Sequence, residues 1–201
     1  MVRVKLYIEG GGDRSSLHTE CRRGFRKLFE NAGFKRMPST KACGSRDSAF
    51  DDFQTACAVA SAEDYPILLV DSEAPVADKP WKHLKKRDKW EKPQNADDDQ
   101  AQLVVQCMET WCVADRKALG DFFGQHLQKS ALPKLNDLER QAKDDIQNKL
   151  NNATRKCGKG REYKKGKRSF ELLTKLDPNV LKEHLPHFKT LCKVLANKLS
   201  S

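Results

Sequence analysis

The chain has 201 residues, 38% of them hydrophobic and 33% charged, with a formal net charge of +10. This length allows one sizeable core, and the lack of a long apolar run or an apolar leader excludes membrane-spanning and secreted classes, so we expect a cytoplasmic protein without membrane contacts. The basic balance favours a polyanionic partner such as nucleic acid.

The first predicted element is a strand that leads into a glycine turn. Apolar residues alternate from Val2 to Ile8, which is the period of a strand with one buried face. Glu9 follows, and then three glycines permit a tight backbone reversal. Asp13 is expected to cap the next helix. Two acids at the end of a strand make this stretch a candidate metal site.

The next segments predict a helix, a strand and a second helix. Apolar residues recur at helical spacing over residues 15–32. We expect a short strand over 34–38 and a loop over 39–45. A helix then begins at Arg46, where backbone amides attract phosphate and the guanidinium would add a bidentate grip. The alternative is ordinary capping of that helix.

Residues 66–73 give the clearest strand in the sequence. A continuous apolar run before Asp71 is typical of a central parallel strand buried on both faces. Strands alternating with helices predict an α/β fold, with a mostly parallel central sheet flanked by helices. Ligands of such sheets gather at the carboxyl ends of the strands. Glu9 and Asp71 both lie at such ends, so we expect them to be neighbours.

Asp71 and Glu73 are two residues apart and face the same side of an extended chain, about 6.6 Å apart along it. Carboxylate oxygens at this separation suit Mg²⁺ or Mn²⁺, with water and phosphate completing the coordination. Burying a carboxylate beside four apolar residues without a partner is expensive. The pair is therefore a second candidate metal-binding element.

Residues 74–99 are expected to form a long surface excursion. Its basic run over 82–87 lies near Trp81 and Trp90, which would either hold a nucleic-acid strand or pin the excursion to the body. We place a fourth strand within 106–114, with a continuous helix as the alternative. Asp115 would then be a further acid at a strand end, and the buried Glu109 would need a metal, a proton or a cation.

The C-terminal part is predicted to be helical and basic. We expect helices over 116–123, 135–153, 169–176 and 180–199, and a division into a metal-binding core, residues 1–130, and a helical extension packed on it, residues 131–201. Residues 155–168 contain eight basic residues and one acid, which favours a phosphate-tracking segment over a solvated loop. The candidate nucleic-acid contacts are Arg46, Arg161, Lys164, Lys165, Lys167 and Arg168.

Several motifs together resemble one family. Glu9-Gly-Gly-Gly-Asp13 and Asp71-Ser-Glu73 resemble the Toprim-like proteins and, more specifically, the family called domain of unknown function 4276. Met108-Glu-Thr-Trp111 with Ala114-Asp115 resembles its second block. Its C-terminal block is similar to residues 165–178. The likeness extends from about residue 6 to residue 198.

This resemblance implies a Toprim-type sheet that binds a divalent metal and acts on phosphodiesters. In such proteins a glutamate ends the first strand and an Asp-x-Asp ends a later one, and these roles carry over to Glu9, Asp71 and, with a longer side chain, Glu73. Relatives often act beside AAA- or ABC-type ATPases in phage defence, including the overcoming-lysogenization-defect nucleases. An ATPase partner is implied in the same way.

The leading hypothesis is a Mg²⁺-dependent endonuclease that acts on DNA or RNA. Asp71 and Glu73, with Asp13 or Asp115, would hold the metal, and Glu9 would be a ligand or a general base. Lys165 or Lys167 would neutralise the phosphate in the transition state, and Glu109 would support the ligands from behind. The alternative is a non-catalytic nucleic-acid-binding subunit of an ATPase complex. The oligomeric state is left open.

Overall fold

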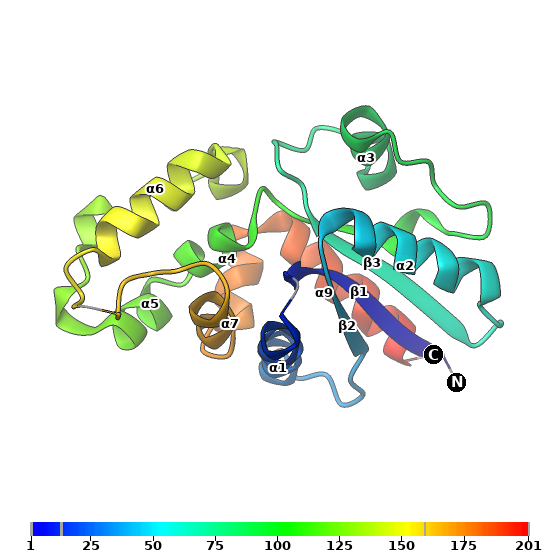
Figure 1. The fold of residues 1–201 in the computed structure, drawn as a ribbon, viewed down its shortest axis with the longest axis horizontal. Coiled ribbons are helices and arrows are strands. Elements are labelled where there is room, and N and C mark those ends of the chain that lie inside the picture. The colour runs from blue at the N-terminus through cyan, green and yellow to red at the C-terminus, as the bar shows by residue number, and fades with distance from the viewer. Residues whose placement is uncertain (1, 13, 159, 201) are drawn as a thin grey trace.

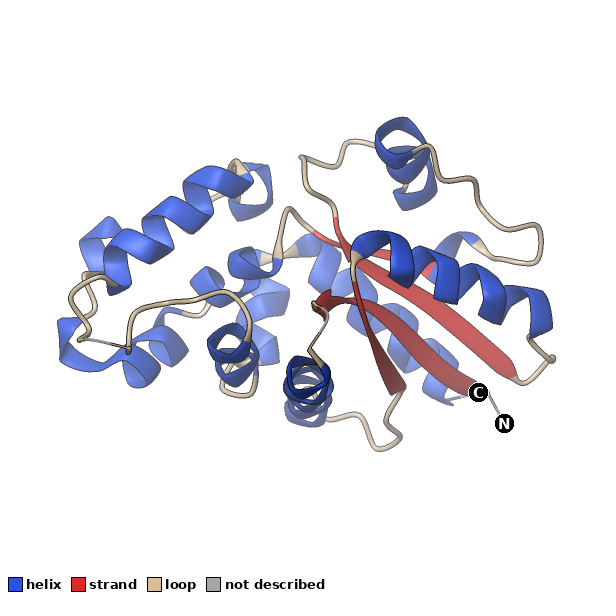
Figure 2. Ribbon diagram, viewed as in Figure 1, coloured by secondary structure: helices blue, strands red, loops and turns tan. Residues whose placement is uncertain are grey.

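A computed structural model describes residues 2–12, 14–158 and 160–200. In this part of the chain, four parallel strands form one sheet with helices on both faces (Figure 1 and Figure 2). The predicted α/β class is therefore confirmed. The strands are β1 (Arg3–Gly11), β2 (Ser39–Gly44), β3 (Asp64–Asp71) and β4 (Ala101–Val104).

The strand order is β2-β1-β3-β4, which fixes where a ligand site is expected. After β1 the chain moves outward to β2, and it then crosses back past β1 to β3 and onward to β4. Neighbouring strands whose connections leave in opposite directions open a crevice at their carboxyl ends. In this sheet that crevice lies between β1 and β3, the strands that carry Glu9 and Asp71.

Side-chain alternation divides the core between the two faces of the sheet. Leu6 and Ile8 of β1 belong to the larger apolar cluster, whereas Tyr7 between them belongs to the smaller one on the other face, because successive residues of a strand point to opposite sides. Both faces of β3 are buried in the same way.

Helices cover each face of the sheet. α2 contacts β1, β2 and β3 on one face, where the 74–99 excursion also packs, and α1 and α9 cover the other. In Figure 1, α5 and α6 lie to the left of the sheet. No helix of the described residues has the length and apolarity to cross a membrane. The helices are α1 (Ser15–Asn31), α2 (Arg46–Val59), α3 (Pro80–Asp88), α4 (Met108–Ala114), α5 (Arg116–Phe123), α6 (Lys143–Thr154), α7 (Lys167–Leu173), α8 (Pro178–His184) and α9 (Pro186–Ser200).

Two predicted strands are wrong. The second strand is residues 39–44, the expected loop, rather than 34–38. It is an edge strand in which only Ala42 is buried, so it lacks the apolar alternation that identifies a strand. Residues 106–114 contain α4, in agreement with the helical alternative, and the fourth strand lies earlier, at β4. Every residue from Glu109 to Ala114 is buried, and a helix buried all round shows no polar face.

The C-terminal helices are confirmed with different boundaries. The helix predicted over 135–153 begins only at Lys143, and the one predicted over 180–199 is divided into α8 and α9 at Pro186. Proline has no amide hydrogen and starts a helix more readily than it continues one. The larger apolar cluster joins residues on both sides of position 130, such as Leu6 and Phe188. The proposed domain division stays a prediction.

Candidate metal centre

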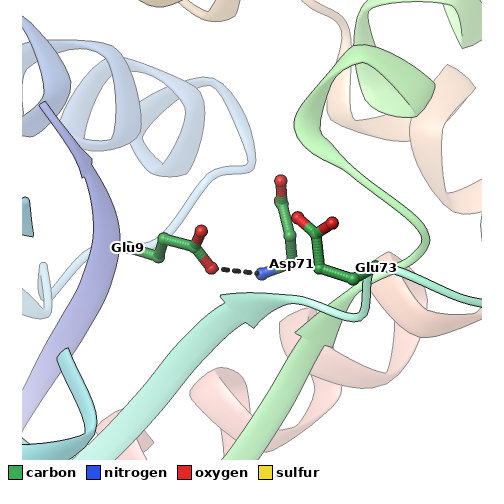
Figure 3. A group of neighbouring side chains, drawn as sticks. All are labelled: Glu9, Asp71 and Glu73. Atoms are coloured by element: carbon green, nitrogen blue, oxygen red, sulfur yellow. Dashed lines mark hydrogen bonds between the residues drawn. The ribbon is translucent and has the colours of Figure 1, made fainter. Parts of the chain in front are cut away.

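Three predicted acids meet at the carboxyl edge of the sheet. Glu9, Asp71 and Glu73 each place one carboxylate oxygen within 4.8 Å of the others. Glu9 reaches across from β1, and the other two side chains lie next to each other beyond the end of β3 (Figure 3). This cluster lies at the crevice that the strand order predicts.

Backbone hydrogen bonds fix the chain around the acids. The amide of Asp71 donates to Glu9 Oε2 at 3.2 Å, which ties the two strand ends together. Glu73 is not extended but has a φ of 62°, and its amide donates to the carbonyl of Gln106 at 2.9 Å. His83 of α3 contacts the carbonyl of Ser72 at 2.9 Å. The chain therefore turns at Glu73, and the turn brings its carboxylate toward Asp71.

Of the three acids, Asp71 has the carboxylate whose negative charge is the least compensated by its surroundings. Burial raises the pKa of Asp71 well above its ordinary value, and the negative charges of Glu9 and Glu109 raise it further. The charge of Lys165 opposes this rise only in part, and the hydrogen bonds of Asp71 within the described residues involve its backbone amide and carbonyl and not its carboxylate. Such a group needs a proton or a cation to be stable.

Glu9 is paired with Arg46, at the start of α2. Arg46 Nη1 lies 3.2 Å from Glu9 Oε2 and also donates to the carbonyl of Asp71. Its Nε and Nη2 donate to both carboxylate oxygens of Asp88, at 3.0 and 2.8 Å, and its guanidinium lies over the ring of Trp90. The side chain is only 14% exposed. The guanidinium of Arg46 therefore makes its bidentate contact with Asp88, and not the bidentate contact with phosphate that the sequence predicts.

Glu73 is paired with cations from two helices. Lys143 Nζ, at the start of α6, donates to Glu73 Oε1. Arg87 Nη2 of α3 lies 3.9 Å from Glu73 Oε2. Burial alone would lower the pKa of Lys143, but the pair with Glu73 raises it above its ordinary value. Nothing in the sequence around Lys143 distinguishes it from other surface cations, and the basic run over 82–87, which contains Arg87, gave no sign of a contact with Glu73.

A cavity of about 320 Å³ opens beside Glu9 and Asp71. The glycine turn, Lys165 and Ser169 belong to its lining. At Gly44, where φ is +79°, a Cβ would lie 2.8 Å from the carbonyl oxygen of Gly12. At Gly11 a Cβ would collide with the ring of His18. Glycine at these positions allows the turn and β2 to approach closely.

Glu109 lies behind the cluster and is 1% exposed. The Tyr163 hydroxyl donates to Glu109 Oε1 at 2.7 Å, and Gln147 Nε2 donates to Oε2 at 3.2 Å. Burial alone would raise the pKa of Glu109, but Tyr163, the charge of Lys165 and Gln147 together lower it below its ordinary value. Hydrogen bonds and a nearby cation therefore keep this buried acid ionised.

Asp115 does not join the cluster. The predicted strand that would have carried it to the sheet edge is α4, and Asp115 instead caps α5. Its Oδ1 accepts the amide of Ala118 at 2.9 Å and its Oδ2 accepts the amide of Asp177 at 2.8 Å. Both oxygens stabilise helix ends, so the expected role in metal binding is wrong. Asp13 lies outside the described residues.

The predicted nucleic-acid contacts lie in different settings. Lys165 is exposed and lines the cavity. Arg168 donates to the carbonyls of Gly160 and Arg161 and lies over Phe122, so it holds the basic segment against α5. Exposed side chains at the surface are Arg161, Lys164, which pairs with Glu162, and Lys167, which pairs with Glu171.

The excursion over 74–99 is pinned to the body. Trp81 and Trp90 are buried, and Trp90 stacks on Phe50 of α2 with ring centroids 4.3 Å apart. Lys82 and Lys86 pair with Asp78. These contacts support the pinning alternative, because buried indoles cannot stack on bases.

The chain was compared with protein families, curated proteins and solved structures. The model of a family described as a domain of unknown function (DUF4276) matches residues 8–196. No curated protein matches the chain, and no solved structure matches it.

Proposed function

We propose, from the premise that the chain belongs to the DUF4276 family, that it is a divalent-metal-dependent nuclease that hydrolyses phosphodiesters in DNA or RNA. The observation that carries the proposal is the convergence of Glu9, Asp71 and Glu73 within 4.8 Å at the crevice between β1 and β3. Arg46 and Lys143 each pair with one of the glutamates, but no such partner contacts the Asp71 carboxylate, and like charges gathered in this way favour a bound metal ion.

The donor set fits Mg²⁺ or Mn²⁺. Both ions prefer carboxylate oxygens and retain water and phosphate as further ligands. The carboxylate of Asp71 accepts no hydrogen bond from the described residues, so its oxygens are free to coordinate. A metal bound here would supply an activated water and charge stabilisation at the leaving oxygen.

The other side chains of the site have roles that follow from their positions. Glu9 faces both Asp71 and the cavity, where it would bind the metal or accept a proton from water. Lys165 lines the cavity, where its ammonium would neutralise a phosphate oxygen as charge develops. Lys167 is exposed and pairs with Glu171, which suits contact with the nucleic-acid backbone outside the cavity.

A second candidate is a non-catalytic nucleic-acid-binding subunit. The observation in its favour is that protein cations already neutralise two of the three acids, Arg46 at Glu9 and Lys143 at Glu73. If the likeness of the sequence motifs to Toprim-like proteins extends to their phage-defence relatives, either candidate would act in a complex with an ATPase. In that setting the partner would control access to the nucleic acid.

The test is cleavage of plasmid DNA and tRNA in Mg²⁺ or Mn²⁺ by the wild type, Glu9→Ala and Asp71→Ala. We expect each substitution to reduce the rate by about 100-fold or more. Asp121→Ala is the matched control, because Asp121 forms an exposed pair with Lys117 on α5. Equal rates in all four proteins would rule out the nuclease. Salt-sensitive binding without turnover would favour the second candidate.

A further inference from the structure

The two glutamates that flank Asp71 differ in how firmly their cations are held. Arg46, the partner of Glu9, has four hydrogen bonds, two of them to Asp88, and a ring contact with Trp90. Lys143, the partner of Glu73, has the Glu73 carboxylate as its one hydrogen-bonded partner among the described residues. One cation is part of the framework, and the other is attached by a single contact.

The position of Lys143 allows it to leave. It is the first residue of α6. The side chains of Lys143 and Glu73 are both partly exposed, at 20% and 21%. An ammonium on a flexible four-carbon chain regains hydration at low cost when it turns outward. A guanidinium that is 14% exposed and bound at several atoms cannot do so.

The negative charge of Glu73 would be poorly compensated if Lys143 moved away and no other cation replaced it. Arg87 is 3.9 Å away and also pairs with Asp88, so its charge is shared. The carboxylates of Asp71 and Glu9 lie within 4.8 Å. A cation that contacts several of these oxygens at once neutralises more charge than one ammonium on one carboxylate.

We propose that Lys143 is a tethered counter-ion that occupies Glu73 in the metal-free protein and is displaced from it by a divalent cation. This inference rests on the metal site of the proposed function but not on catalysis. Metal binding is then an exchange of one cation for another at Glu73, while Arg46 stays in place at Glu9. The ammonium remains attached to α6 beside the site after it is displaced.

The test measures Mn²⁺ affinity by electron paramagnetic resonance, without nucleic acid. Removing the competing ammonium in Lys143→Met is expected to tighten binding roughly tenfold, the effect of about 1.4 kcal/mol. Lys143→Arg keeps a cation and should bind within about twofold of the wild type. Lys149→Met is the matched control, because Lys149 lies on the same helix and pairs with Asp145 away from the cluster.

Thermal melting in EDTA and in Mn²⁺ provides the second measurement. Lys143→Met should melt at a lower temperature than the wild type in EDTA, because three acids have lost a counter-ion, and should gain more from Mn²⁺, because its affinity is higher. Removing a merely structural lysine would lower the melting temperature in EDTA without a larger gain from Mn²⁺. Lys143→Gln, which keeps a hydrogen-bond donor, replaces Lys143→Met if the latter does not fold.

The outcomes separate this inference from the nuclease proposal. Equal or weaker Mn²⁺ binding by Lys143→Met overturns the counter-ion, even if the wild type cleaves nucleic acid. Tighter binding by Lys143→Met supports it, even if no protein cleaves anything. An absence of Mn²⁺ binding in the wild type and in every variant overturns it as well.

Discussion

The Glu9 end and the Glu73 end of the acidic cluster carry the same chemical group at similar exposure, 23% and 21%, but they are built differently. Glu9 is held by the Asp71 amide and by Arg46, which Asp88 and Trp90 fix in turn. Glu73 lies on a turn and faces two cations, Arg87 of α3 and Lys143 of α6. A strand of the sheet positions Glu9, and cations of two helices compensate the negative charge of Glu73.

This difference indicates how a cluster of acids folds without a metal. At the Glu9 end, Arg46 is a fixed partner that preserves the geometry. At the Glu73 end, we propose that Lys143 is an exchangeable partner that compensates the negative charge until a metal ion binds. A site with two permanent partners would hold its shape and exclude a metal. A site with none would resist folding, because unpaired buried charges are costly.

The largest expected effect comes from breaking the Glu9 end. Arg46→Met leaves Asp88, which is 10% exposed, without its bidentate partner, and we expect a loss of about 3 kcal/mol or more in the free energy of unfolding, measured in urea. Arg46→Lys should recover little, because lysine lacks the planar fork. Arg26→Met removes an exposed pair with Glu30 and should cost less than about 1 kcal/mol. Similar small losses in all three would show that the Glu9 end is not fixed by Arg46.

An intermediate effect is expected from Glu109, a third acid that is held by neutral donors. Tyr163→Phe removes the hydroxyl that donates at 2.7 Å, and hydrogen bonds to charged groups contribute about 1.5–3 kcal/mol. We expect a loss in this range by urea denaturation. Tyr7→Phe is the control, because the Tyr7 hydroxyl has no hydrogen bond to any described residue that would be lost. No difference between the two variants would mean that Glu109 does not depend on Tyr163.

The smallest expected effect concerns Asp71, which lies between the two ends. In EDTA the folded protein keeps the Asp71 proton at pH values where the unfolded chain, with a pKa near about 3.9, has lost it. Stability should therefore fall as the pH rises through the raised pKa of Asp71. Asp71→Asn removes this fall and should raise the melting temperature at pH 8 by roughly 2–4 °C, the effect of about 1 kcal/mol in a chain of this size.

The pH series contains its own control. At pH 4 the carboxyl group of Asp71 is neutral in the folded protein, so the aspartate and asparagine proteins should melt at similar temperatures. Asp121→Asn, on the exposed surface of α5, should change nothing at either pH. If Asp71→Asn melts at a lower temperature than the wild type at pH 8, the claim that the ionised Asp71 carboxylate destabilises the metal-free fold is wrong.

The parts of the molecule that follow from chain geometry are predictable from the sequence. Apolar alternation predicted β1, a continuous apolar run predicted β3, and the rule that parallel strands end at a common edge predicted that Glu9 and Asp71 are neighbours. Glu73 joins them through a turn with a φ of 62°, and the prediction that it lies on an extended chain is wrong. The predictions for β2 and α4 are wrong, because β2 is an edge strand with one buried residue and the residues of α4 from Glu109 onward are all buried. The error at α4 also misplaced Asp115, whose oxygens cap helices.

The cations of the site were harder to predict. Arg46 was expected to face a phosphate, but its partners Asp88 and Trp90 lie more than 40 residues further along the chain, and only the folded chain brings them together. Lys143 is a lysine beside two aspartates, a pattern that ordinary surface helices also contain. Side chains that balance charge through long-range contacts have no local spacing by which they can be recognised.

Helix α3 reaches both ends of the cluster. His83 contacts the Ser72 carbonyl, Arg87 faces Glu73, and Asp88 grips Arg46. A movement of this nine-residue helix would loosen the support of Glu9 and expose Glu73 in one step. A displacement of α3 would therefore change the electrostatic environment of Asp71 without moving any strand of the sheet.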